Sequence, residues 1–212
     1  MRLYSHYFSS PRTAAKNFLL PWLLVLAGLF VSGVQAQTTV VILRHGEKPE
    51  AGLGQLNCKG LNRALALPSV LLQRFGTPVA MYAPNPAELK KDKGVPYAYI
   101  RPLATIEPTA IRVGLPVNLE GAMDNIRPLV DRLLSAAPGS YFVAWEHHWA
   151  ANMARSLVSA AGADPTVVPN WADDDFDSLY VISLGPVPSA GGRGVRFEHQ
   201  QQGLNGLSLT CP

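Results

Sequence analysis

Two patterns of apolar residues alternate along this chain. Short runs of consecutive apolar residues, bounded by glycine, proline or charged residues, predict buried β-strands. Longer segments in which apolar residues recur every three or four positions predict amphipathic helices. The expected strands lie at 38–43, 79–82, 141–145, 179–184 and 195–198, and the expected helices at 60–75, 101–113, 121–137 and 150–161.

The alternation of strands with helices predicts an α/β fold, in which a mostly parallel sheet carries helices on both faces. Pro68 and Pro108 lie inside two of the expected helices and predict kinks there. Two polar segments interrupt the pattern, namely 85–96 with its lysines and 164–175 with its prolines and aspartates. Both are expected to be surface loops. The sequence shows no internal repeat, and its length suits one domain.

The first 36 residues have the layout of a secretory signal. Arg2, Arg12 and Lys16 form a basic region without acids, residues 18–31 are almost wholly apolar, and Ala36 supplies the small residue at the cleavage position. The alternative is an uncleaved membrane anchor, since the apolar run is only slightly short for a span. The sequence thus predicts a signal peptide at 1–36, a domain at 37–212, and export to the periplasm.

Removal of the signal would leave a domain without net charge. The full sequence has 18 Lys and Arg against 15 Asp and Glu; the signal carries three of the cations and no acid, so 15 of each remain. The sequence contains no basic stripe with interleaved aromatic residues, which argues against a nucleic-acid partner. Any anion that the domain binds must therefore be held by a local cluster of cations.

The two cysteines, Cys58 and Cys211, are expected to form a disulfide, because export exposes them to an oxidising compartment. Such a bridge would tie the C-terminus to the N-terminal half and close a loop of about 150 residues. Chain-entropy arguments give that closure ~4 kcal/mol of stabilisation, less any strain. The alternative is a pair of free thiols.

Polar and charged residues follow directly after two of the strongest expected strands. Arg44 and His45 follow the first of them, and His147 follows the strand that ends near residue 145. Arg101 precedes a proline and is expected at a helix N-terminus. The carboxyl ends of parallel strands open on one edge of a sheet, where α/β proteins bind their ligands, so these four residues are expected to converge. Two guanidinium groups and two imidazoles suit a phosphoryl group, because arginine holds its oxygens bidentately.

Four segments resemble, in the same order, the motifs of the histidine phosphatase superfamily, which has a phosphoglycerate-mutase-like fold. Residues 43–47 (LRHGE) are similar to its Arg-His-Gly signature, and 56–64 resemble the Leu-Thr-x-x-Gly-x-x-Gln-Ala start of its first helix. Residues 101–105 are similar to the Arg-x-x-x-Thr segment that supplies its second pocket arginine. Residues 144–147 lie where its second pocket histidine ends a strand. The resemblance covers the whole expected domain.

This resemblance implies covalent phosphoryl transfer without a metal or another cofactor. His45 would be the nucleophile, with one ring nitrogen left unprotonated by a hydrogen bond at the other. Arg44, Arg101 and His147 would hold the three non-bridging oxygens and neutralise charge in the transition state.

The donor of a proton to the leaving oxygen stays open. Mutase-type members of the family carry an acid after the second arginine, and the candidates here are Glu120, Glu107 and Glu146. We rank Glu120 first, because it follows a short extended stretch at 115–117 and can reach the edge of the sheet. The acid-phosphatase branch has Asp directly after the pocket histidine, where this chain has His148; His148 is an alternative donor or a solvent-facing helix residue.

The acidic run Asp173, Asp174 and Asp175, with Asp177 close by, does not have the alternating spacing of a calcium loop. No metal site is therefore expected there, and Asp177 is expected to be a turn or capping residue.

The sequence thus predicts an exported phosphomonoesterase that acts on a small phosphorylated substrate through a phosphohistidine at His45. A mutase is less favoured, because export would separate it from cytosolic sugar phosphates. One alternative is a phosphatase specific for cell-envelope sugar phosphates. Another is a non-catalytic protein that binds a phosphorylated ligand, since fold does not fix function. Membrane contact is expected only through the signal, if that segment is not cleaved.

Overall fold

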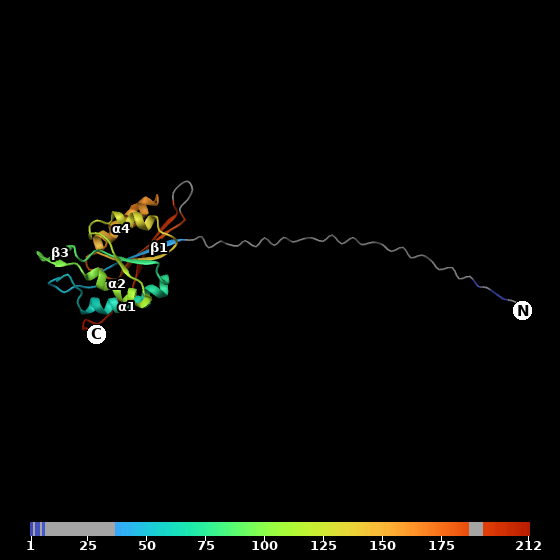
Figure 1. The fold of residues 1–212 in the computed structure, drawn as a ribbon, viewed down its shortest axis with the longest axis horizontal. Helices are drawn as coiled ribbons and strands as arrows, with labels where there is room; N and C mark the ends of the chain where they lie inside the picture. Colours follow the sequence, from blue (N-terminus) through green and yellow to red (C-terminus); the bar gives the residue numbers. More distant parts are fainter. Residues whose placement is uncertain (2, 5, 7–36, 187–192) are drawn as a thin grey trace. The chain divides into compact units, whose positions relative to one another are not determined.

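The computed structural model describes residues 1, 3, 4, 6, 37–186 and 193–212. The predicted signal sequence and its cleavage site therefore lie outside the described residues, apart from four positions at the start. The chain divides into two units, Met1–Gly33 and Val34–Pro212, and only the second is discussed below (Figure 1). Among the described residues, no helix has both the length and the apolar character needed to cross a membrane.

The domain is built on a six-stranded sheet in the order β5-β2-β6-β1-β7-β8. The first four strands in that order are parallel to one another, and β7 and β8 join through antiparallel pairings. The strands are β1 (Thr38–Arg44), β2 (Ala80–Ala83), β5 (Val117–Leu119), β6 (Gly139–Trp145), β7 (Ser178–Leu184) and β8 (Val195–Gln201). The predicted mostly parallel sheet is thus confirmed.

Helices cover both faces of this sheet, as predicted. Helices α1 (Cys58–Phe75) and α2 (Arg101–Val113) lie below it in Figure 1, and α4 (His147–Ala160) lies above it. Helix α3 (Arg127–Leu134) packs with α4 on the same side. A hydrophobic core lies on each face of the sheet. Successive side chains of β1 alternate between the two cores: Val40 and Ile42 face the α3–α4 side, and Val41 and Leu43 face the α1–α2 side.

One predicted helix begins later than expected. The helix predicted at 121–137 is observed only over Arg127–Leu134. Gly121 has a positive φ of 70°, which is not helical, and the residues after it form a turn. Proline in the first turn of α3 fixes the actual start.

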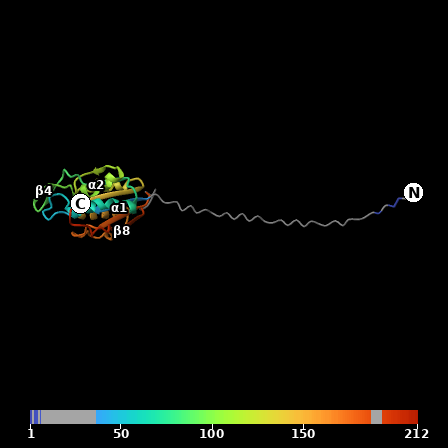
Figure 2. The same ribbon diagram turned by 90° about the horizontal axis from the view of Figure 1, so that it is seen from below.

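The prediction of a surface loop at 85–96 is wrong, because most of that segment is a β-hairpin. Strands β3 (Leu89–Asp92) and β4 (Val95–Ala98) pair antiparallel around a two-residue turn in which Lys93 and Gly94 have φ of 48° and 86°. The hairpin lies at the far end of the domain, beyond the carboxyl ends of the parallel strands (Figures 1 and 2). Residues 89–91 alternate in exposure, and Asp92 is buried and forms an ion pair with Arg101.

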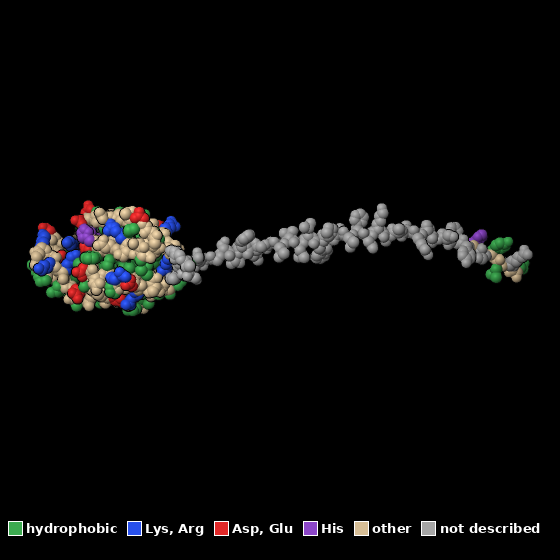
Figure 3. Space-filling view, turned by 90° about the horizontal axis from the view of Figure 1, so that it is seen from above, with side chains coloured by type: hydrophobic (Ala, Val, Ile, Leu, Met, Phe, Trp, Pro, Cys, Tyr) green, Lys and Arg blue, Asp and Glu red, His purple; other side chains and the backbone are tan. Residues whose placement is uncertain are grey.

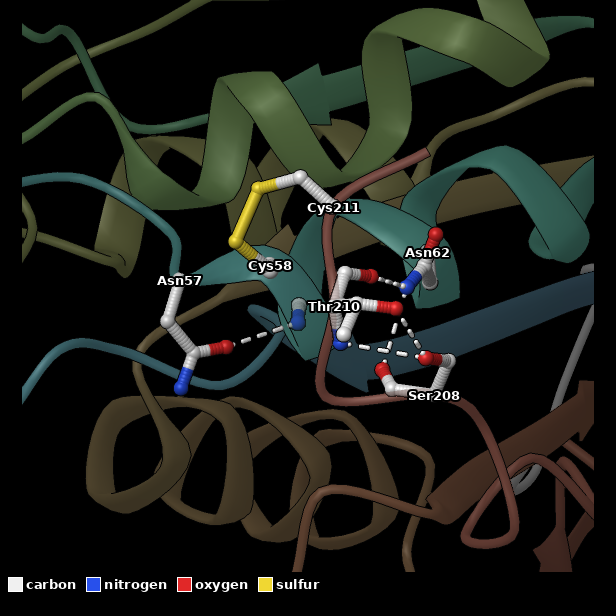
Figure 4. Close-up of a disulfide and its surroundings, with 7 residues drawn as sticks. Asn57, Cys58, Asn62, Ser208, Thr210 and Cys211 are labelled. Carbon is white, nitrogen blue, oxygen red and sulfur yellow. Dashed lines mark hydrogen bonds between the residues drawn. A yellow bond between two sulfur atoms is a disulfide. The ribbon is translucent and has the colours of Figure 1, made fainter.

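The predicted disulfide between Cys58 and Cys211 is confirmed, with the two Cα atoms 4.5 Å apart (Figure 4). Asn62 holds the same tail by donating hydrogen bonds to the carbonyl oxygens of Ser208 (3.0 Å) and Thr210 (2.8 Å). The C-terminus is thus fixed on the first two turns of α1. A disulfide of this kind is typical of proteins in an oxidising compartment.

Candidate active site

The carboxyl ends of β1 and β6 lie side by side and supply the core of the site. Arg44 is in register with Trp145, and His45 N donates a hydrogen bond to the carbonyl oxygen of Trp145 at 3.0 Å. The residues that follow these two strands are therefore neighbours. The edge also receives Arg101 from the first turn of α2.

Gly46 allows the turn after His45 to pack between two helices. A Cβ atom at this position would lie 2.9 Å from the carbonyl oxygen of Gly60 at the start of α1, which is too close. Gly46 N donates to Thr105 Oγ1 at 2.9 Å, and that hydroxyl donates to the carbonyl oxygen of Arg101 at 2.8 Å. The turn is thus fixed to both α1 and α2.

His45 is buried and holds a defined tautomer. Its Nδ1 lies 2.7 Å from the carbonyl oxygen of Gly46. Because a carbonyl oxygen only accepts hydrogen bonds, Nδ1 carries the proton, and the neutral ring then has a lone pair on Nε2. Burial lowers the pKa of His45 well below its ordinary value, and the positive charges of Arg101 and Arg44 lower it further. The imidazole is therefore neutral near pH 7, with an available Nε2.

Arg44 is buried beside His45 and fastens the segment before β7. Its Nη1 donates to the carbonyl oxygens of Asp173 (2.7 Å), Asp175 (2.9 Å) and Ala172 (3.3 Å). Its guanidinium carbon lies 3.8 Å from the centre of the Phe176 ring. Within the described part of the chain, Nε of Arg44 has no hydrogen-bond partner.

Arg101 is almost fully buried and forms a bidentate ion pair with Asp92 of the hairpin. The distances are 2.6 Å from Nη1 to Oδ2 and 3.2 Å from Nη2 to Oδ1. Burial alone would raise the pKa of Asp92, but the hydrogen bonds from Arg101 and from Gly54 N lower it overall. Nε of Arg101 is also buried, and no described residue accepts a hydrogen bond from it.

His147 lies at the start of α4 with a carboxylate beside each ring nitrogen. Glu146 Oε1 is 2.8 Å from Nδ1, within the distance but outside the angle of a hydrogen bond. Asp173 Oδ1 is 2.8 Å from Nε2. Burial would raise the pKa of Glu146, but His147, Lys90 and the backbone N–H of Trp149 together lower it to about 2. Glu146 is therefore ionised near pH 7.

Two side chains near His45 were not anticipated from the sequence. The ring of Tyr99 lies edge-on to His45 with centroids 5.8 Å apart, and its buried hydroxyl has no partner among the described residues. Lys90 Nζ lies 4.9 Å from the centre of the Tyr99 ring and 3.6 Å from Glu146 Oε1. Lys90, Tyr99 and Met123 line a pocket of about 230 Å³ between the hairpin and the segment 122–124.

The other proton-donor candidates have described contacts with residues other than His45, or are exposed. Glu120 follows β5, which is three strands from β1, and its carboxylate pairs with Arg132 of α3 at 2.6 Å. Glu107 is exposed on α2. His148 is largely exposed, with Nε2 3.7 Å from Asp173 Oδ1.

A buried network of ion pairs joins Glu47, which follows the turn after His45, to Arg63 and Asp177. Arg63 of α1 is fully buried and binds Glu47 bidentately (2.9 and 2.7 Å) and Asp177 at 2.8 Å. Asp177 accepts hydrogen bonds from the backbone N–H groups of Gly203 and Leu204, so it joins α1 to the C-terminal tail rather than only closing a turn. The sequence contained one signal for this network: Arg63 lies four positions before Leu67, so a charged residue occupies the apolar stripe of α1.

Comparisons with known proteins give a fold but no match by sequence. No family model and no curated protein sequence matches this chain. A candidate phosphohistidine phosphatase SixA from Nakamurella multipartitia has a similar structure, with a TM-score of 0.51 at 14% identity over 78% of this chain and 96% of that one. A protein described as mycobacterial hydrolase 2 has a TM-score of 0.51 at 16% identity, over 76% and 89% of the two chains. The domain thus shares its α/β fold with these two proteins, and the predicted fold class is confirmed.

Proposed function

We propose that this protein is a phosphomonoesterase that acts through a phosphohistidine at His45. The observation that carries the proposal is the state of His45: its ring is neutral, Nδ1 donates a hydrogen bond to a carbonyl oxygen, and Nε2 is left as a nucleophile in the field of two buried arginines. The similarity in fold to a candidate phosphohistidine phosphatase supports the same chemistry.

In the first step, the Nε2 lone pair of His45 attacks the phosphorus atom and forms a P–N bond. The ester P–O bond breaks, and its electron pair goes to the leaving oxygen, which takes up a proton. In the second step, water attacks the phosphohistidine, the P–N bond breaks, and inorganic phosphate leaves while Nε2 regains its lone pair.

Arg44, Arg101 and His147 hold the three non-bridging oxygens in this mechanism. The Nε–H groups of both arginines are buried donors without partners among the described side chains, which suits them to a phosphoryl oxygen. His147 Nε2 now contacts the Asp173 carboxylate, and a phosphoryl oxygen would take the place of that carboxylate. These cations make a metal unnecessary for the proposed reaction.

We propose Glu120 as the donor of the proton to the leaving oxygen, because it follows the extended stretch at 115–117 and can reach the edge of the sheet. Its ion pair with Arg132 must open, and the carboxylate must take up a proton from solvent, before Glu120 can protonate the leaving oxygen. Glu146 pairs with Lys90 of the pocket, but a carboxylate whose pKa is about 2 has no proton to give near pH 7.

The substrate is proposed to be a small phosphate ester outside the cytosol, and envelope sugar phosphates form one such class. The pocket beside Lys90 and Tyr99 is the space available for its leaving group. A second candidate function is the binding of a phosphorylated ligand without turnover. The position of Glu120 favours this second candidate: Glu120 follows β5, and two strands lie between β5 and β1, which precedes His45, so the proposed proton donor does not lie beside the nucleophile.

The test is hydrolysis of an aryl phosphate in EDTA by the purified protein and by His45→Ala, with His199→Ala on β8 as the exposed-histidine control. We expect turnover by the wild type and the control and none by His45→Ala. An acid-labile, base-stable phosphate on the wild type after rapid quenching would identify the phosphohistidine. Equal activity of His45→Ala would contradict the mechanism, and binding of inorganic phosphate without turnover would favour the second candidate.

A further inference from the structure

The buried polar atoms that lack hydrogen-bond partners are concentrated at the candidate site. Within the described part of the chain there are five such side-chain atoms, and four of them belong to Arg44, Tyr99, Arg101 and His147. Burial of a polar group without a partner costs stability, so this cluster indicates groups that a ligand would satisfy. The mechanism proposed above assigns roles to the two arginines and the histidine but none to Tyr99.

Tyr99 is held between the hairpin and α2, and only 1% of its surface is exposed. Ile100 N donates to the carbonyl oxygen of Ala98 at 3.0 Å, and α2 begins at the next residue. The Tyr99 ring lies edge-on to His45, with centroids 5.8 Å apart, and the guanidinium carbon of Arg101 lies 4.8 Å from its centre. Tyr99 therefore lies beside both the proposed nucleophile and one of the arginines proposed to hold the phosphoryl group.

The Tyr99 hydroxyl lies in the electrostatic field of both arginines. Burial raises the pKa of Tyr99, while the positive charges of Arg101 and Arg44 act in the opposite direction. After burial, Tyr99 is in turn the largest influence on the pKa of Arg44. Because the pKa of the phenol is raised overall, it keeps its proton near pH 7, and its O–H can donate one hydrogen bond.

The pocket of about 230 Å³ beside the hairpin brings a ligand into contact with Tyr99. Tyr99 lines this pocket together with Lys90 and Lys91, and Lys90 Nζ lies 4.9 Å from the centre of the Tyr99 ring. Lysine and arginine side chains are exposed, beside acidic ones, at the end of the domain that carries the hairpin (Figure 3). An anion that enters the pocket therefore meets positive charge beside the Tyr99 ring.

The charge of Arg44 favours an anion over water as the partner of the Tyr99 hydroxyl. Arg44 is buried, its Nη1 donates to carbonyl oxygens, and it forms no ion pair with any acid in the described ranges. A buried charge needs a counter-charge, which a water molecule does not supply. A phosphoryl group supplies it, and each of its negative oxygens accepts more than one hydrogen bond, so a hydroxyl and a guanidinium group can share one oxygen.

We propose that Tyr99 is a fourth phosphate-binding residue, whose hydroxyl donates a hydrogen bond to a non-bridging oxygen of the substrate and of the phosphohistidine. The inference rests on the proposed function, since it adds a further group to the same site. The hydroxyl keeps its proton throughout, so the leaving oxygen still takes its proton from another group. The hydrogen bond contributes to catalysis because it stabilises the charge on the phosphoryl oxygens in the transition state.

Binding is tested by calorimetric titration of inorganic phosphate into the wild type, Tyr99→Phe and Tyr97→Phe. We expect at least about tenfold weaker binding in Tyr99→Phe, since a hydrogen bond to a charged group is lost. Tyr97→Phe is the matched control, because Tyr97 lies two residues away on β4, is only half-buried and does not line the pocket; it should bind as the wild type does. Equal affinities of the two variants would overturn the proposal.

Urea unfolding separates a role in phosphate binding from a role in the fold. Without phosphate, Tyr99→Phe should be at least as stable as the wild type, because the substitution removes a buried hydroxyl that has no partner among the described residues. With phosphate, the wild type should gain more stability than Tyr99→Phe. A loss of stability in the variant without phosphate would show that the hydroxyl has a partner within the protein and would overturn the proposal.

Turnover distinguishes phosphate binding from proton donation. Tyr99→Phe should slow hydrolysis of nitrophenyl phosphate and of an alkyl phosphate by the same factor, about 10²–10³-fold, because both substrates share the phosphoryl group. A loss confined to the alkyl phosphate would make Tyr99 a proton donor and overturn the proposal. If the wild type binds phosphate without turnover, the proposed function fails, and the affinity of Tyr99→Phe still decides the role of Tyr99. Turnover with equal affinities would instead retain the function and remove Tyr99 from the site.

Discussion

Asp92 and Arg101 form a buried bidentate ion pair that joins the hairpin β3–β4 to the first turn of α2. The sequence pattern around Asp92 predicted a solvated loop, and the pattern around Arg101 predicted the start of a helix. Their pairing explains how a polar hairpin becomes part of the site. It orients a guanidinium that, in our proposal, holds the phosphoryl group.

We expect Asp92→Asn to destabilise the fold by about 3 kcal/mol or more, because the substitution leaves the buried charge of Arg101 without its partner. The matched control is Asp131→Asn, which breaks the exposed pair with Arg127 on α3 and should cost less than about 1 kcal/mol. Urea unfolding of the three proteins measures both changes. Similar losses in the two variants would show that burial of the Asp92 pair does not determine its strength.

The disulfide should contribute stability even though other contacts hold the tail. A Cys58→Ser/Cys211→Ser variant is expected to lose about 2–5 kcal/mol, since the bridge closes a loop of 153 residues in the unfolded chain. The measurement is urea unfolding with and without a thiol reductant. Reductant should lower the stability of the wild type to that of the variant and leave the variant unchanged; an unaffected wild type would show that the bridge does not form in solution.

His45 should titrate below the ordinary histidine range. Nitrogen-15 NMR, with the signals assigned by their loss in His45→Ala, is expected to show at pH 7 a neutral ring with the proton on Nδ1. Because burial lowers the pKa of the folded state, the unfolded chain binds this proton first as the pH falls. Stability from this group is therefore complete above about pH 6.5 and is lost as the pH falls towards the folded pKa. A midpoint at or above 6.5, or a proton on Nε2, would contradict the proposed nucleophile.

The sequence predicted those parts of the structure that depend on apolar periodicity. The run at 40–43 predicted a buried strand, because each of its side chains faces one of two cores. The hairpin was missed, because its buried polar residue, Asp92, has its partner Arg101 outside the segment, and no pattern within 85–96 contains that information. The late start of α3 depends on the turn after Gly121, which the helical periodicity concealed.

The same distinction applies to the site. Arg44, His45, Arg101 and His147 were predicted to meet because they follow strand ends or begin a helix, and the structure places them at one edge of the sheet; their roles stay predictions. The contacts of Asp173 with His147 and of Tyr99 with His45 join segments distant in sequence. Such side-chain pairs are set by tertiary packing, so local spacing does not predict them.

The role of Glu120 can be separated from phosphate binding by the choice of leaving group. A nitrophenolate leaves without a proton, whereas an alkoxide needs one, so Glu120→Gln should slow turnover of an alkyl phosphate by about 10²–10⁴-fold and leave that of nitrophenyl phosphate nearly unchanged. Glu107→Gln is the matched control, since that carboxyl group is exposed on α2, and it should alter neither rate. Wild-type rates of Glu120→Gln on both substrates would exclude this donor. The same pair of substrates applied to Tyr99→Phe would then test the buried hydroxyl beside His45.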